Sequence, residues 1–127
     1  MGPITTHVLN TAAGAPAVGL QVRLRRKCAE TEGGDIEWEM IQESLTDQDG
    51  RLKDLSEGLH LQMGEVYELR FDTMSYFKSS GAECFYPFVT VVFIIHDPSR
   101  CWLQELCCPR DGDRCAIIYY FMQVCGL

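Results

Sequence analysis

Residues 4 to 20, ITTHVLNTAAGAPAVGL, decide the fold, because they predict a β-strand that runs into a turn. Alternate side chains of a strand point to opposite faces, which places Ile4 and Val8 toward a core and His7 on the other face. The glycines and proline that follow supply turn chemistry. A histidine on the outward face is either an ordinary residue of a pleated surface or a functional group.

Four later segments also predict strands, separated by turns at intervals of about ten residues. Three of them alternate between apolar and polar residues, which leaves one solvent-exposed face. The fourth is apolar on both faces, as in a strand at the centre of the fold or against a partner subunit. Residues 73 to 81 predict a short helix that ends at Gly81. The predicted fold class is all-β, a two-sheet antiparallel sandwich with one short helix. The strand segments are 20 to 26, 36 to 46, 66 to 72 and, as the apolar one, 88 to 95.

A polar turn, DQDGR at residues 47 to 51, joins two of these segments. Gly50 tolerates a positive φ, and Asp49 is the residue that we expect to shape the turn. The turn delivers Arg51 to the edge of the sheet. Taken alone, an arginine in this place is most simply a solvated turn residue.

A chain of 127 residues suits a single domain that spans residues 1–127. Its formal net charge of -7 disfavours nucleic acid and anionic membranes as partners, which leaves small molecules or proteins. No apolar run reaches the length of a membrane span, and no secretory signal precedes the first strand. The expected compartment is the cytoplasm, with the peroxisome as the alternative although the chain does not end in S-K-L.

Seven cysteines are present, and five of them fall within residues 101 to 125. Their odd number and the missing secretory signal favour reduced thiols over a disulfide framework. A zinc site is the more specific hypothesis for this cysteine cluster. However, Cys107, Cys108 and Cys115 do not form the closely spaced C-x-x-C type of pair that zinc sites use. The cysteine spacing therefore disfavours a zinc site.

The segment from residue 100 to residue 127 differs from the rest of the chain in how its charged and apolar residues are distributed. Charged residues gather in PRDGDR, and the following AIIYYFMQVCGL is long enough for a strand but not for a membrane span. We expect these residues to form an atypical part of the domain.

Four stretches, PITTHVLNTAAGAPAVGL, TDQDGR, YELRFDT and CFYPFVTVVFIIHDP, resemble the 5-hydroxyisourate hydrolases, the enzymatic branch of the transthyretin-like proteins. The resemblance runs in order over residues 3 to 98. It implies a transthyretin-like sandwich that assembles as a homotetramer, a dimer of dimers, with the substrate in a central intersubunit channel. By motif, His7 and Arg51 would face that channel as the catalytic and substrate-binding residues.

Two motifs of that family are missing from the last part of the chain. The family's second histidine follows the D-P turn and corresponds by counting to Leu103, and the chain ends QVCGL where the family has Y-R-G-S. The resemblance implies hydrolysis of 5-hydroxyisourate, a cyclic amide of urate degradation in purine metabolism, without a metal or cofactor. The alternatives are a catalytically impaired or inactive member, and a small-molecule binder that uses the channel.

The two site residues suit the hydrolysis of a cyclic amide. A neutral imidazole accepts a proton from water near neutral pH, because its unperturbed pKa is about 6.5. An arginine offers a fixed charge and several N–H donors to the oxyanion that forms on the carbonyl. His7 would therefore act as the base or orient the water, and Arg51 would act as an electrophilic clamp.

Overall fold

The computed structural model describes residues 3–10, 13–52, 54–79, 81, 86–98, 101–107 and 118–125. Strands dominate these ranges, as the alternating sequence predicts. In chain order the elements are β1 (Ile4–Asn10), β2 (Ala15–Pro16), β3 (Gln21–Glu30), β4 (Ile36–Leu45), β5 (Arg51–Leu52), β6 (Val66–Phe71), α1 (Thr73–Ser79), β7 (Val89–Ile94), β8 (Cys101–Cys107) and β9 (Ile118–Cys125).

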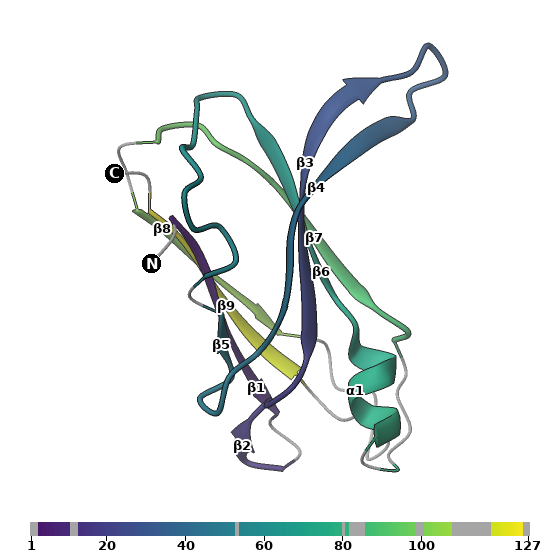
Figure 1. The fold of residues 1–127 in the computed structure, drawn as a ribbon, viewed down its shortest axis with the longest axis vertical. Coiled ribbons are helices and arrows are strands. Elements are labelled where there is room, and N and C mark those ends of the chain that lie inside the picture. The colour runs from purple at the N-terminus through teal and green to yellow at the C-terminus, as the bar shows by residue number, and fades with distance from the viewer. Residues whose placement is uncertain are drawn as a thin grey trace.

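The strands form two antiparallel sheets that pack as a sandwich (Figure 1). The first sheet has the order β2-β1-β9-β8, with β5 also paired to β1, and we call it the β1 sheet. The second has the order β4-β3-β6-β7, and we call it the β3 sheet. The predicted fold class, an all-β two-sheet antiparallel sandwich with one short helix, is confirmed.

The core lies between the two sheets and includes the alternate strand residues that the sequence pattern places inward. In β1, Ile4 and Val8 are fully buried, whereas His7 on the opposite face is half-buried. Burying one large apolar side chain contributes about 1.5–3 kcal/mol, so the alternation determines which face of β1 looks outward. The buried apolar residues are Ile4, Val8, Ala17, Leu20, Val22, Leu24, Leu52, Leu55, Tyr67, Leu69, Phe71, Phe77 and Ile95.

Strand β7 lies at the edge of the β3 sheet, paired to β6 on one side. Its inward residues pack against the core, but Val92 and Ile94 on the outward face are 55% and 46% exposed. The prediction that this apolar segment forms the centre of the fold is therefore wrong for the single chain. Apolar residues on both faces of a strand indicate two covered faces, and the described residues of this chain cover only one of them.

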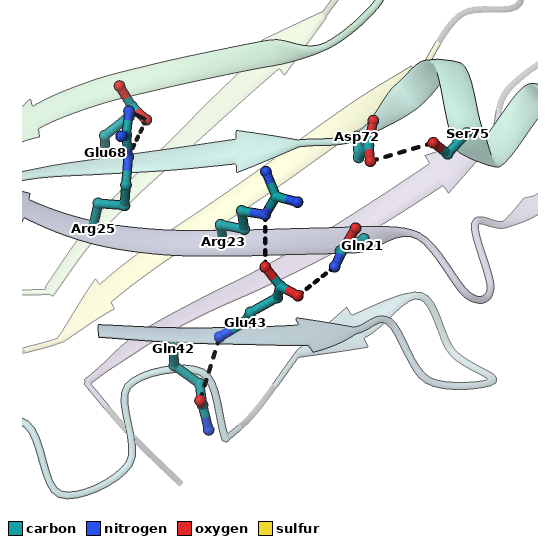
Figure 2. A network of polar contacts seen from close by, with 8 residues as sticks. All are labelled: Gln21, Arg23, Arg25, Gln42, Glu43, Glu68, Asp72 and Ser75. Carbon is teal, nitrogen blue, oxygen red and sulfur yellow. Dashed lines mark hydrogen bonds and ion pairs between the residues drawn. The ribbon is translucent and has the colours of Figure 1, made fainter. Parts of the chain in front are cut away.

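The outward face of the β3 sheet carries a network of polar contacts (Figure 2). Arg25 donates from Nε and Nη2 to one oxygen of Glu68, at 2.9 and 2.5 Å. Arg23 donates to Glu43 at 2.6 Å, and Gln21 donates to the second oxygen of the same carboxylate at 2.6 Å. The alternation in β6 predicts a solvent-exposed Glu68, yet this residue is only 7% exposed and forms an ion pair with Arg25.

Helix α1 packs at one end of the sandwich (Figure 1). It buries Phe77, and the Tyr76 hydroxyl accepts a hydrogen bond from Nδ2 of Asn10 at 3.1 Å, which links the helix to the end of β1. Gly81 follows the helix with φ of +76° and donates to the carbonyl of Lys78, as a helix-ending glycine does. Among the described residues, no helix has the length and apolar character needed to cross a membrane.

The last described strand, β9, runs antiparallel to β1 on one side and to β8 on the other. The register pairs Ile4 with Val124 and Asn10 with Ile118, so β9 spans the whole length of β1. The apolar run near the C-terminus is therefore a strand, as its length predicts, and its backbone is paired on both sides.

A buried serine closes the other edge of β1 beyond the short strand β5. The Ser56 hydroxyl accepts a hydrogen bond from the backbone N–H of Ile4 at 2.7 Å and donates to the carbonyl of the same residue at 2.8 Å. Ser56 is 1% exposed, so water does not compete for these groups. The serine therefore takes the place of a neighbouring strand at this position.

We expect Ser56→Ala to lower the free energy of unfolding by about 2–3 kcal/mol, because it leaves two buried backbone groups of Ile4 without a partner. Urea unfolding followed by circular dichroism would measure the loss. Ser79→Ala is the control: it removes an exposed hydroxyl at the end of α1, and we expect a change within about 0.5 kcal/mol. An equal effect of the two substitutions would contradict this account.

Candidate active site

His7 and Arg51 lie side by side on the β1 sheet. The antiparallel register of β1 with β5 pairs Thr6 with Leu52 and His7 with Arg51. Residues directly opposite each other in an antiparallel pair project from the same face, with Cβ atoms about 4.5–5.5 Å apart. The structure thus brings together the two residues that the sequence analysis singled out, on the outward face of the sheet.

The hydrogen bond between Val8 and Gly50 shows which type of cross-strand pair His7 and Arg51 form. The N–H of Val8 donates to the carbonyl of Gly50 at 2.8 Å, so the backbone polar groups of Val8 point to the edge of β1 on which β5 lies. Hydrogen-bonded and non-hydrogen-bonded pairs alternate along an antiparallel ladder, which makes His7 and Arg51 a non-hydrogen-bonded pair. In such pairs the Cα atoms are about 4.5 Å apart and the side chains are at their closest.

Gly50 brings the turn into contact with β1. Its φ is +74°, and a Cβ placed on it would lie 2.3 Å from the carbonyl oxygen of Val8. No side chain fits at that distance, so glycine is required for the turn to approach the strand. The close approach is what allows the Val8 hydrogen bond and sets Arg51 opposite His7.

The side chain that shapes this turn is Asp47. Its Oδ1 atom accepts hydrogen bonds from the backbone N–H groups of Asp49 at 2.8 Å and Arg51 at 3.0 Å. Asp49, the residue expected to shape the turn, contributes its backbone N–H, and within the described residues no hydrogen bond or ion pair of its carboxylate is found. The sequence did contain a signal for the role of Asp47, because aspartate is favoured at the first position of a turn, where its side chain accepts hydrogen bonds.

The backbone register extends the row of His7 and Arg51 across the sheet. Position 121 in β9 pairs with His7, and position 105 in β8 pairs with position 121. Two register positions along the strands, another row joins Thr5, Gln123 and Leu103. The position that the resemblance assigns to a second histidine therefore lies in the same sheet, two register positions from the row of His7, but it carries a leucine in this chain.

The remaining histidines lie outside the strands that carry His7 and Arg51. His60 is exposed in the loop after β5, and His96 is exposed after β7. Of the cysteines weighed as zinc ligands, Cys108 and Cys115 fall outside the described residues. Within the described part of the chain, no group of three or more His, Cys, Asp or Glu side chains is placed to hold a metal ion.

A family model described as HIUase/Transthyretin family matches residues 4–108 of this chain. The match covers most of the chain and includes both strands that carry the His7 and Arg51 pair. The chain belongs to the HIUase/Transthyretin family. The transthyretin-like character that the resemblance implied for the sandwich is thereby confirmed.

Individual members of the family agree with this assignment. The 5-hydroxyisourate hydrolase of Mus musculus is 45% identical over 93 residues, which cover 73% of this chain and 75% of the mouse protein. Sea bream transthyretin, solved in complex with thyroxine, superposes with a TM-score of 0.63 at 26% identity, over 92% of this chain and 90% of its own. The 5-hydroxyisourate hydrolase of Klebsiella pneumoniae superposes with a TM-score of 0.58 at 27% identity, over 72% and 77%.

Proposed function

We propose that this protein hydrolyses 5-hydroxyisourate in urate degradation and needs no metal or organic cofactor. The observation that carries the proposal is the cross-strand pairing of His7 with Arg51 on an outward face. Relatives that carry the name 5-hydroxyisourate hydrolase support the choice of substrate. In the reaction, water adds to a ring carbonyl, the C–N bond of the cyclic amide breaks, and the released nitrogen takes up a proton.

The pair of residues suits the two demands of this reaction. His7 accepts a proton from the attacking water or orients that water toward the carbonyl carbon. Arg51 donates N–H groups to the carbonyl oxygen as it becomes negative, and its fixed charge stabilises the oxyanion. Because the two side chains start from directly opposed positions, one small substrate can contact both at the same time.

We further propose that residues 1–127 form one domain and that the protein assembles as a homotetramer, a dimer of dimers. The resemblance to the hydrolase family supports this assembly, and so do the exposed apolar residues Val92 and Ile94 on the edge strand β7. A tetramer would place the outward face of the β1 sheet along an intersubunit channel. The proposed compartment is the cytoplasm, with the peroxisome as the alternative, on the sequence argument alone.

A second candidate function is the binding of a small molecule without turnover. The observation that favours it is Leu103, because a leucine at the position of the family's second histidine cannot transfer a proton. Sea bream transthyretin, which this chain resembles in structure, was solved in complex with a small molecule, thyroxine. A catalytically impaired enzyme would have the same channel and would lack the same second histidine.

The decisive experiment follows the decay of freshly generated 5-hydroxyisourate by ultraviolet absorbance. We expect the purified protein to accelerate the decay over buffer, and the His7→Ala/Arg51→Ala double variant to give the rate in buffer. Sizing chromatography of both proteins would show that they share one assembly state. A folded tetramer that leaves the decay unchanged would overturn the proposal and favour the binding function.

A further inference from the structure

Arg51 begins the short strand β5, which has only two residues, so the ladder with β1 supplies few hydrogen bonds to hold it. The bond from Val8 goes to Gly50, one residue before Arg51. Because Arg51 and His7 form a non-hydrogen-bonded pair, the N–H and the carbonyl of Arg51 point away from β1. Something other than β1 must fix the backbone of Arg51.

Asp47 binds both of these backbone groups. Its Oδ1 atom accepts the N–H of Arg51 at 3.0 Å, and its own N–H donates to the carbonyl of Arg51 at 3.0 Å. The same Oδ1 atom accepts the N–H of Asp49, and the carbonyl of Asp47 accepts the N–H of Gly50 at 2.9 Å. One residue therefore closes the turn and fixes the peptide groups from which the Arg51 side chain extends.

We propose that Asp47 is a positioning residue, whose carboxylate holds Arg51 opposite His7 for substrate binding and catalysis. This inference rests on the proposed function for its catalytic consequence, but the hold on Arg51 is a property of the turn itself. Hydrogen bonds to an ionised carboxylate are about twice as strong as neutral ones. A displacement of about 1 Å in a group that must meet the transition state can cost about 10²-fold in rate.

Asp49 provides a matched control in the same turn. It is an aspartate two residues from both Asp47 and Arg51, and its carboxylate makes no hydrogen bond or ion pair among the described residues. Asp49→Ala and Asp47→Ala each remove one negative charge from the turn. Only Asp47→Ala removes the acceptor for Arg51, and Asp47→Asn removes the charge but retains a side-chain oxygen.

The catalytic part of the proposal is tested by a double-mutant cycle on kcat/KM for 5-hydroxyisourate. We expect Asp47→Ala to lower kcat/KM by about 10- to 100-fold, and Asp47→Asn and Asp49→Ala to stay within about 3-fold of the wild type. In an Arg51→Ala background, Asp47→Ala should have no further effect, because Asp47 acts through Arg51. A loss of the same size in both backgrounds would overturn the positioning role.

Hydrogen exchange of the Arg51 backbone amide, measured by NMR, tests the hold on Arg51 without any need for activity. We expect exchange at least about 10-fold faster in Asp47→Ala than in the wild type, with Asp49→Ala unchanged. Unchanged exchange in Asp47→Ala would overturn the proposal whatever the activities. If the wild type fails to hydrolyse the substrate but the exchange result holds, the proposed function is wrong and the positioning of Arg51 by Asp47 stands.

Discussion

Replacing His7 by alanine is expected to lower kcat/KM for 5-hydroxyisourate by about 10²- to 10⁴-fold, the usual range for the loss of a general base. The substitution removes the imidazole that pairs with Arg51 across β1 and β5, and it leaves the oxyanion donor in place. Absorbance decay at several substrate concentrations would measure the loss. Because the base acts in the chemical step, most of the decrease should appear in kcat.

Two measurements keep this result separate from a loss of structure. His7 lies on the outward face and is not part of the buried core, so His7→Ala should unfold at nearly the wild-type urea concentration. His60→Ala, which alters an exposed histidine in the loop after β5, should leave kcat/KM unchanged. Full activity of a correctly folded His7→Ala variant would refute the role of His7 as base.

Gly50→Ala is expected to have the largest effect on stability, a loss of about 2–6 kcal/mol in the free energy of unfolding. Alanine at φ of +74° is strained, and its Cβ would lie 2.3 Å from the carbonyl oxygen of Val8. Relief of that clash requires the turn to move away from β1, which breaks the Val8 hydrogen bond. Urea unfolding would measure the stability of the variant.

Gly58→Ala separates the two causes of this loss. Gly58 has a similar φ of +80°, but a Cβ placed on it would meet nothing within 4 Å. It should therefore cost only the left-handed conformation of an alanine, about 1–2 kcal/mol. If Gly50→Ala proves no more destabilising than Gly58→Ala, the close packing of the turn on β1 is not what holds Arg51 in register.

The sequence determined the strands and the face on which each candidate residue lies. Ile4 and Val8 of β1 had to point inward, because exposing these apolar side chains costs more free energy than any local preference supplies. His7, between them, was thereby placed outward before any tertiary contact was known. The glycine and aspartates of the turn likewise predicted a tight connection that ends at Arg51.

The tertiary structure decided which strands pair and in which register. Strand β7 has the sequence of a doubly covered strand but lies at an edge, because sheet order depends on contacts between residues far apart in the chain. The pairing of His7 with Arg51, and the choice of Asp47 over Asp49 as the residue that binds Arg51, depend on the same long-range packing. A local pattern fixes the direction of a side chain, whereas its partner is set by the strand that packs beside it.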